Sequence, residues 1–242
     1  MKVLLISDIH SNSTALKAVL SAAEGYEAVW CLGDLVGYGP DPNECIQIIQ
    51  ELPELICLLG NHDAAVVGVI ESAAFNPEAR AVVNWTKEVL TPENMEFLTQ
   101  RPPKKVAEQI TLAHASPRYP IWEYLLDTYT ADANFEHFDT EICLVGHTHV
   151  PVIYHRKNGP TSTIAYIPEP NNRYELPLRV IANPGSVGQP RDRDPRAAYV
   201  IFDTETHIWD YYRVEYNVGE VQTRMEKLGL PERHIRRLSA GW

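Results

Sequence analysis

Seven side chains of the kinds that bind metal ions follow short apolar runs of the sequence. They are Asp8, His10, Asp34, Asn61, His114, His147 and His149. No lysine or arginine lies among them, so bringing them together would cost free energy unless a cation joined them. We therefore predict a site for two metal ions.

The donor types indicate which chemistry this site would perform. Oxygen and imidazole donors without a thiolate suit two divalent ions of manganese, iron, zinc or nickel. Asp34 stands midway in the order and, as a carboxylate, can bridge two cations. Such a pair lowers the pKa of bound water to about 7 and can hold a bridging hydroxide that attacks phosphorus.

A proton donor for the leaving oxygen is also needed. His62 is adjacent to Asn61 and is the candidate general acid. The alternative is that His62 orients a ligand or contacts phosphate. For Asp63 we expect a supporting role beside a ligand.

The elements that must position these side chains are five apolar runs. They span residues 3–6, 29–33, 55–60, 110–113 and 142–146. Runs of this length suit strands buried on both faces, in a parallel or mixed sheet covered by helices. Ligands collect at the carboxyl ends of such strands, so we expect the seven side chains along one rim.

Helices are predicted between the strands. One begins at Asn12 and ends at Gly25, and a second begins at an Asp41 N-cap with a capping box to Glu44. Residues 64–108 are predicted to form a helical insertion beside the site, with helices at 79–90 and after 91. Amphipathic helices of this kind usually serve packing alone.

Beyond His149 the pattern becomes strand-rich. Asn158-Gly159 predicts a hairpin between strands 151–156 and 161–167, followed by a loop over 168–175. We expect a strand at 178–182 and an antiparallel pair at 197–202 and 208–214. The last predicted helix covers 218–228 and is capped by Gly229. Without a linker or repeat, residues 1–242 are predicted to be one domain.

Composition restricts the class of protein. A net charge of −11 argues against general nucleic-acid binding. No stretch has the roughly 18 apolar residues of a membrane span, and no signal-peptide pattern is present, so we expect a cytoplasmic protein. The four cysteines form no C-x-x-C pair and are predicted to be buried thiols. A homo-oligomer is left open.

The loop after His114 is rich in aromatic residues. Tyr119 and Trp122 could stack on a nucleoside or aryl group of a substrate. They could equally form a hydrophobic lid or a subunit contact.

Together, the five blocks resemble those of the calcineurin-like metallophosphoesterase superfamily. The blocks are Asp8-Ile9-His10, Gly33-Asp34, Gly60-Asn61-His62-Asp63, His114 and Gly146-His147-Thr148-His149. The segment 183–188 further resembles a small bacterial and archaeal branch of phosphoesterases. The resemblance implies an α/β fold, a four-layer αββα sandwich of two mixed sheets. It also implies one metal bound by Asp8, His10, Asp34 and His149, and another bound by Asp34, Asn61, His114 and His147.

One departure from the superfamily concerns phosphate binding. Its protein serine/threonine phosphatases carry an Asp and an Arg where this chain has Gly37 and Tyr38. Candidate substrate-binding residues are therefore Tyr38, Arg118 and Arg191, or the backbone amides of 185–188. The alternative for Arg191 is a solvated run in which neighbouring aspartates compensate the charge.

The sequence thus predicts a metal-dependent phosphodiesterase or phosphomonoesterase acting on a small phosphorylated substrate. A dinucleoside polyphosphate hydrolase and a protein phosphatase are the enzymatic alternatives. A metal-binding scaffold without catalytic activity is the alternative from another class.

Overall fold

Two mixed β-sheets form the centre of the computed structural model, which describes residues 1–157, 159 and 161–242. Within these residues the first sheet has the order β3 (Ile56–Cys57), β2 (Ala28–Cys31), β1 (Lys2–Ile6), β11 (Ala197–Asp203), β12 (Ile208–Val214) and β9 (Asn172–Glu175). The second has the order β4 (Lys104–Ala107), β5 (Ile110–Ala113), β6 (Ile142–Leu144), β10 (Val180–Asn183), β7 (Val152–Arg156) and β8 (Thr163–Tyr166).

Each sheet combines parallel strands, which end at the site, with antiparallel strands. In the first sheet β1 pairs in parallel with β2 and β2 with β3, while β11 runs antiparallel to β1. In the second, β6 is parallel to both β5 and β10. The carboxyl ends of the parallel strands therefore point to one edge of each sheet, as predicted.

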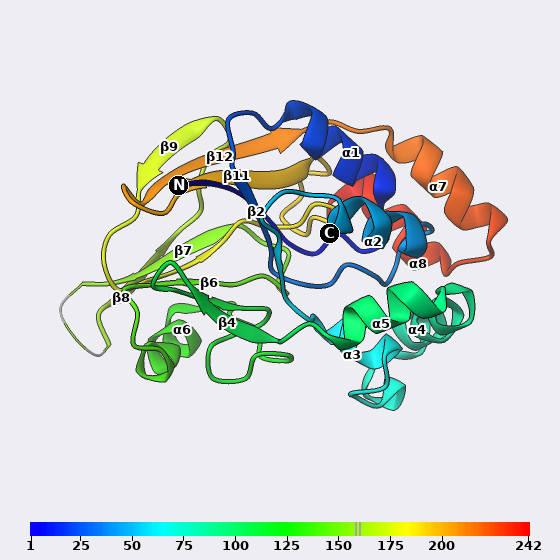
Figure 1. Ribbon diagram of the computed structural model, residues 1–242, viewed down its shortest axis with the longest axis horizontal. Coiled ribbons are helices and arrows are strands. Elements are labelled where there is room, and N and C mark those ends of the chain that lie inside the picture. The colour runs from blue at the N-terminus through cyan, green and yellow to red at the C-terminus, as the bar shows by residue number, and fades with distance from the viewer. Residues whose placement is uncertain (158, 160) are drawn as a thin grey trace.

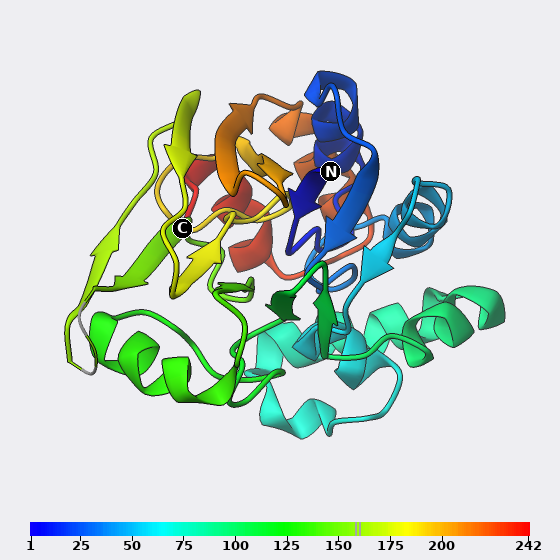
Figure 2. The same cartoon turned by 60° about the vertical axis from the view of Figure 1, so that its left-hand side comes forward.

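Helices cover both outer faces of the two sheets (Figures 1 and 2). Helices α1 (Ser13–Ala22) and α2 (Pro42–Gln50) pack through Leu16 and Ile46 against the first sheet. Helix α6 (Thr128–Asn134) and the 3₁₀ turn η2 (Phe135–His137) cover the second through Phe135. Between the sheets lies a shared core that includes Trp30 and Trp209. The predicted four-layer αββα sandwich is confirmed.

The remaining helices gather at one end of the molecule (Figure 1). They are α3 (Asn61–Val66), the 3₁₀ turn η1 (Ser72–Ala74), α4 (Pro77–Val89), α5 (Pro92–Thr99), α7 (Val218–Lys227) and α8 (Glu232–Ala240). Val82 of α4, Met225 of α7 and Leu238 of α8 share one apolar cluster. No helix in the described part of the chain is both long and apolar enough to cross a membrane.

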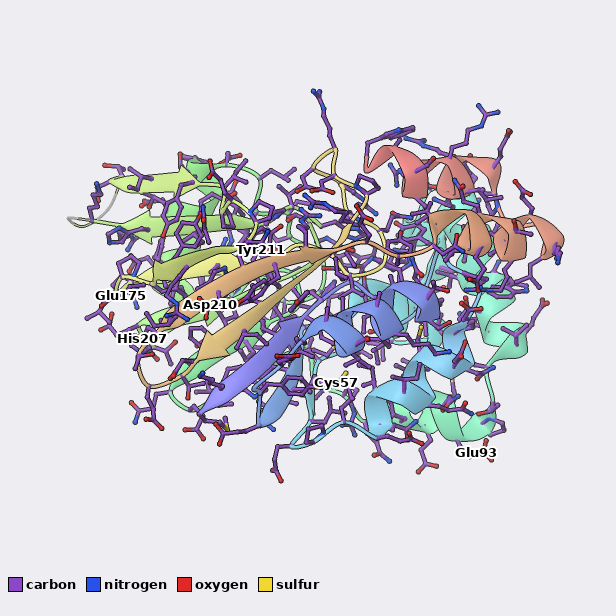
Figure 3. All side chains as sticks on the ribbon, turned by 90° about the horizontal axis from the view of Figure 1, so that it is seen from above. Cys57, Glu93, Glu175, His207, Asp210 and Tyr211 are labelled. Atoms are coloured by element: carbon purple, nitrogen blue, oxygen red, sulfur yellow. The ribbon has the colours of Figure 1, made fainter. Side chains whose placement is uncertain are left out.

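Several predictions about elements were wrong. The stretch 64–108 is not wholly helical, because its last residues form β4 at the edge of the second sheet. Residues 172–175 form β9 instead of a loop, since their backbone pairs with β12; Figure 3 shows Glu175 and Asp210 on these neighbouring strands. The chain continues past the predicted last helix into α8.

The predicted capping box at α2 is also absent. Asp41 precedes the helix but makes no side-chain cap bond. Its carboxylate instead accepts hydrogen bonds from Ser13 Oγ at 2.9 Å and Arg224 Nη2 at 2.8 Å, which ties α2 to α1 and α7.

Other predictions are confirmed. Strands β11 and β12 form the expected antiparallel pair, and β7 pairs antiparallel with β8 as the hairpin requires. Asn158 of the predicted turn lies outside the described residues. All four cysteines are buried free thiols. That residues 1–242 form one domain stays a prediction.

Candidate metal centre

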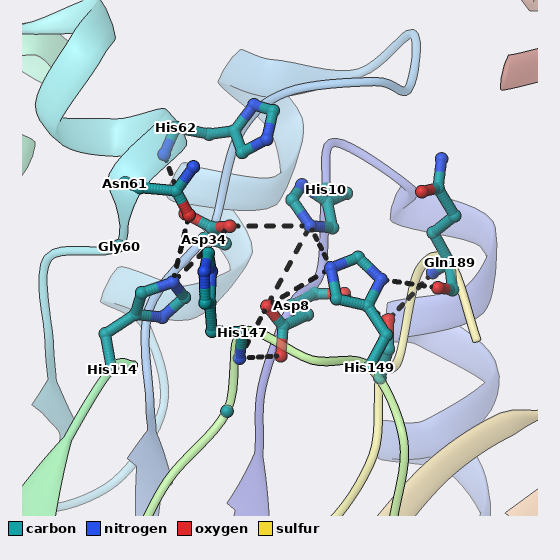
Figure 4. Close-up of polar contacts among 12 residues, drawn as sticks. Asp8, His10, Asp34, Gly60, Asn61, His62, His114, His147, His149 and Gln189 are labelled. Atoms are coloured by element: carbon teal, nitrogen blue, oxygen red, sulfur yellow. Dashed lines mark hydrogen bonds and ion pairs between the residues drawn. The ribbon is translucent and has the colours of Figure 1, made fainter. Parts of the chain in front are cut away.

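The seven predicted ligand residues come together where parallel strands of both sheets end (Figure 4). Asp8 and His10 follow β1, Asp34 follows β2, and Asn61 begins α3 after β3. The remaining three follow β5 and β6 of the second sheet, and these are His114, His147 and His149. All seven are at most 2% exposed.

The donor atoms fall into two groups that share one carboxylate. Asp8, His10, Asp34 and His149 form the first group, and Asp34, His114 and His147 form the second. Within each group the potential ligand atoms all lie within 4.8 Å of one another. These groups coincide with the two ligand sets that the family resemblance implied, apart from Asn61.

Three imidazole rings are held by backbone carbonyls. The Nδ1 atoms of His10, His114 and His149 lie 3.0, 2.8 and 2.6 Å from the carbonyl oxygens of Val36, Leu32 and Gln189. A carbonyl only accepts hydrogen bonds, so each Nδ1 carries the proton and each Nε2 presents a lone pair. The rings are thereby oriented as ligands before any ion binds.

The lone pairs converge without a proton between them. His10 Nε2 and His149 Nε2 are 3.0 Å apart. His114 Nε2 likewise faces Asn61 Oδ1 at 3.2 Å. Both contacts bring acceptors together, which is unfavourable unless a cation joins them. The buried Nε2 of His147 has no hydrogen-bond partner, so it too is available to a cation.

Asp34 lies between the two groups. Its Oδ2 is 3.5 Å from both His10 Nε2 and His114 Nε2. Its Oδ1 accepts a hydrogen bond from the His62 amide at 2.9 Å. Asp34 therefore has the geometry of the predicted bridging carboxylate.

The pKa values of the predicted ligand residues indicate that the metal-free site has no positive charge of its own. Burial is the largest cause that holds the pKa of His10, His147 and His149 well below the ordinary value, so these rings are neutral near pH 7. Burial also raises the pKa of Asp8 to about 7 and that of Asp34 well above its ordinary value. A divalent cation would bind the neutral imidazoles and would stabilise the ionised form of both carboxylates. The residues present therefore fit two divalent metal ions.

Metal affinity should rise with pH between about 6 and 8. Asp8 must lose its proton to bind a cation, and below pH 7 most molecules of the metal-free protein carry that proton. The raised pKa also makes the stability of the metal-free fold depend on pH, in the opposite direction. The stability that protonated Asp8 contributes is present in acid and is lost as pH rises through about 7. Calorimetric titration with Mn²⁺ in buffers of different ionisation enthalpy should count the protons released.

The control for this titration is Asp139→Asn, which alters an exposed carboxyl and should leave the pH dependence unchanged. Equal affinity at pH 6 and pH 8, without proton release, would contradict the assignment of Asp8 as a ligand.

The backbone at the ligands is unusual. Asp8, His10, Asp34, His147 and His149 have φ between 48° and 64°, in the left-handed region. Such conformations cost of order 1–3 kcal/mol each and persist where the surroundings impose them. They turn the chain sharply after each strand, so that side chains two residues apart reach the same centre.

A close approach explains the glycine before Asn61. A Cβ atom on Gly60 would lie 2.0 Å from Asp34 Oδ1 and 2.3 Å from the Asp34 amide nitrogen. Only glycine therefore permits the loop that carries Asn61 to contact the loop that carries Asp34.

His62 lies in the wall of the cavity next to the metal ligands. Its ring packs 4.4 Å from Tyr38 and 4.8 Å from Phe75. Its Nδ1 is buried without a hydrogen-bond partner. Burial, followed by the charge of Arg191, holds its pKa well below the ordinary value. The ring is therefore neutral near pH 7 and would have to gain a proton before it could act as the general acid, a role that stays a prediction.

Asp63 supports neighbouring loops, as expected. Its carboxylate accepts hydrogen bonds from the amides of Val36 and Gly60, both at 3.0 Å, and from Leu35 at 3.3 Å. It thereby links the start of α3 to the loop that carries Asp34.

A cavity of about 250 Å³ opens onto the ligands. Its lining consists of Asp34, Tyr38, Asn61, His62, Ala74, Phe75, Asn76, Trp122, Tyr124, His147, His149 and Arg191. The predicted substrate residues Tyr38 and Arg191 are among them, whereas Arg118 is not. The Arg118 guanidinium instead pairs with Glu123 and lies over the ring of Tyr119.

Two expectations about anion binding were wrong. The amides of Gly185, Val187 and Gly188 donate to the protein itself, to Asn183 Oδ1 and to the carbonyls of Ser7 and Asp8, so they are not available to phosphate. Arg191 is also not compensated by its neighbours, because Asp192 pairs with Arg213 and Asp194 with Arg196.

Sequence reasoning missed part of the cavity wall. Phe75 and Asn76 come from the segment that was expected to serve packing alone, whereas Tyr124 belongs to the aromatic loop after His114. The ring of His234 of α8, a residue for which the sequence predicted no role, lies 4.6 Å from that of Tyr38. For this missed part of the wall, the aromatic residues in the loop after His114 were the only indication in the sequence, and Trp122 was the lining residue named there.

Comparisons with known proteins agree with this geometry. Residues 1–207 match the calcineurin-like phosphoesterase superfamily domain. The crystal structure of a metallophosphoesterase from Sphaerobacter thermophilus has a TM-score of 0.92 and 42% identity, covering 100% of this chain and 99% of that chain. An uncharacterised protein of Methanocaldococcus jannaschii is 36% identical over 237 residues, 95% of this chain and 94% of that protein. A symmetrical bis(5'-nucleosyl)-tetraphosphatase of Cronobacter sakazakii is 29% identical over 129 residues, 51% of this chain and 45% of that enzyme.

Proposed function

The chain belongs to the calcineurin-like phosphoesterase superfamily, a family of phosphoric ester hydrolases, and we propose that it hydrolyses a small phosphodiester or phosphomonoester at a pair of divalent metal ions. The observation that carries this proposal is the carboxylate of Asp34, which belongs to both groups of potential ligand atoms and lies 3.5 Å from the Nε2 atoms of His10 and His114. When bound, two such ions supply an ionised water near neutral pH and positive charge beside the phosphoryl oxygens.

Residues of the chain position the substrate around that centre. Arg191 is the one arginine or lysine in the described lining of the cavity, and its Nη2 donates a hydrogen bond to the neutral Gln189 Oε1 at 2.9 Å. We propose that Arg191 binds the phosphoryl oxygens of the substrate, to which a guanidinium binds well. We propose that His62 contacts the leaving oxygen of the substrate through the N–H of its neutral ring.

Several features favour a small substrate over a phosphoprotein. The metal-ligand side chains are nearly inaccessible beneath the cavity, whose volume is about 250 Å³. Pockets that enclose a drug-sized molecule usually measure about 300–1,000 Å³. The Asp and Arg typical of the protein phosphatases are replaced here by Gly37 and Tyr38. A protein phosphatase is therefore the weaker alternative.

Hydrolysis of a dinucleoside polyphosphate is a second candidate. The partial similarity to bis(5'-nucleosyl)-tetraphosphatases favours it, and so do the aromatic side chains in the cavity wall. The similarity spans about half of this chain, so it supports the chemistry more strongly than the substrate.

The proposal is tested with a substrate panel. Protein loaded with Mn²⁺ or Zn²⁺ should hydrolyse bis(p-nitrophenyl) phosphate or p-nitrophenyl phosphate, and should act poorly on a phosphoserine in a folded protein. Metal analysis of the same sample is the control for loading. If two equivalents of metal are bound and no ester in a broad panel is hydrolysed, the non-catalytic scaffold becomes the better account.

A further inference from the structure

Four aromatic side chains line the cavity that opens onto the metal centre, and we call them the collar. The collar consists of Tyr38, Phe75, Trp122 and Tyr124. These residues come from three segments distant in the sequence, so the arrangement is a product of the fold. All four line the same cavity as Asp34 and His147.

The collar rings contact one another and the rings at the site. Phe75 lies 5.0 Å from Trp122 and 4.8 Å from His62. Tyr124 lies 4.1 Å from His147 at an interplanar angle of 35°. Through the rings of His62 and His147, these contacts connect Tyr38 to Tyr124 along the wall of the cavity.

This wall is not fully used by the protein. Tyr124 is 45% exposed although it packs on a buried ligand, and Phe75 and Trp122 are partly buried. All three side chains also line the cavity, so part of their exposed surface faces it. Partly open aromatic faces beside a phosphoryl site can stack on a flat ring of the substrate.

The part of the cavity next to Tyr38 is polar and cationic. The Arg191 guanidinium lies 5.5 Å from the Tyr38 ring centre, and its buried Nε has no hydrogen-bond partner. A ligand that fits the cavity needs an anionic group near Arg191 and an aromatic group against Phe75, Trp122 or Tyr124. The cavity has room for one such group with its phosphate, so the rest of a larger molecule would extend outside.

We infer that the collar is a subsite for an aryl group or nucleobase, which makes the substrate a phosphate ester or anhydride carrying one flat aromatic group. This inference rests on the proposed function for the position of the phosphoryl group. Trp122 and Tyr124 are the residues that determine this specificity. Phosphorylated sugars and lipids, which lack a flat ring, should bind more weakly.

Two ligands that differ only in the base test the inference. AMP and ribose 5-phosphate share the phosphoryl group and the sugar. Calorimetric titration of the Mn²⁺-loaded protein should show about 10- to 100-fold tighter binding of AMP, in line with base stacking on aromatic side chains. In Trp122→Ala and Tyr124→Ala the preference should fall several-fold, while affinity for ribose 5-phosphate stays within about threefold.

Matched variants separate stacking from damage to the loop. Trp122→Phe should keep most of the preference for AMP. Tyr119→Ala lies on the same loop, but its ring is 60% exposed and outside the cavity lining, so the preference should be unchanged. Metal content measured on every variant shows whether His147 still binds its ion.

The two levels of the proposal fail differently. Equal affinity for AMP and ribose 5-phosphate, or a preference that survives both alanine variants, overturns the collar subsite and leaves phosphoester hydrolysis standing. A clear preference for AMP without hydrolysis of any ester overturns the proposed function and leaves the subsite standing.

Discussion

Replacing Asp34 with asparagine should reduce phosphoester hydrolysis about a thousandfold or more. Asp34 Oδ2 lies 3.5 Å from the Nε2 atoms of both His10 and His114, so we propose that Asp34 would be a ligand of both metal ions. An amide is neutral and cannot bridge two cations as a carboxylate does. A metal ion contributes several kcal/mol of charge stabilisation to the transition state, which corresponds to at least this loss in rate.

The fold should survive this substitution. Asparagine keeps an oxygen that can accept the hydrogen bond from the His62 amide, which now goes to Oδ1 at 2.9 Å. Burial raises the pKa of Asp34 well above its ordinary value, so a neutral side chain suits the metal-free site. Without metal, the variant should therefore melt at the same temperature as the parent protein or higher.

Metal content and activity together decide the outcome. Mass spectrometric metal analysis should find fewer than two equivalents of metal in Asp34→Asn, and Mn²⁺ should raise its melting temperature less than that of the parent. Glu93→Gln, which alters an exposed side chain of α5, is the matched control and should behave as the parent does. Full activity with two bound ions in the Asp34 variant would exclude the bridging role.

The ligands could be predicted because they depend on a local pattern. Each follows a short apolar run, and a buried run followed by a polar ligand residue identifies a strand end without knowledge of the sheet. The five runs became strands that end at one centre. The family resemblance supplied the division of ligands between two ions, which spacing alone had left open.

The collar and the substrate residues could not be predicted in the same way. Arg118 and Arg191 look equivalent in the sequence, and the choice between them depends on Glu123, which folds back onto Arg118. Phe75 reaches the site only because η1 and α4 are placed beside α3. These contacts are tertiary and leave no periodic signal.

The missed elements share a related cause. The sequence of strand β9, NRYE, does not alternate between apolar and polar residues. The strand is held mainly by backbone hydrogen bonds to β12, which leave no pattern in the sequence. Helix α8 has the sequence ERHIRRLSA and buries only His234, Ile235 and Leu238. A sequence that is mostly polar gives little indication of a helix whose few apolar residues pack on α7.

Gly188→Ala should destabilise the protein by about 3 kcal/mol or more, because a Cβ atom there would lie 1.8 Å from the carbonyl oxygen of Ile9. That oxygen belongs to the backbone between Asp8 and His10, so it cannot move aside without shifting both ligands. The Gly188 amide also donates to the Asp8 carbonyl at 3.0 Å, and its own carbonyl accepts from Asn12 Nδ2 at 3.0 Å. The segment 185–188, first considered for anion binding, thus supports the backbone of the metal centre.

Denaturant unfolding of the metal-free protein measures this effect, and loss of Mn²⁺ binding should accompany it. Gly219→Ala is the contrasting control, because Gly219 lies in α7 with its nearest neighbour 3.7 Å from the added Cβ, and alanine should there stabilise the helix by about 0.5–1 kcal/mol. If Gly188→Ala unfolds at the same denaturant concentration as the parent, the loop does not press on the Asp8–His10 backbone. The left-handed conformations of these two ligands would then need another cause.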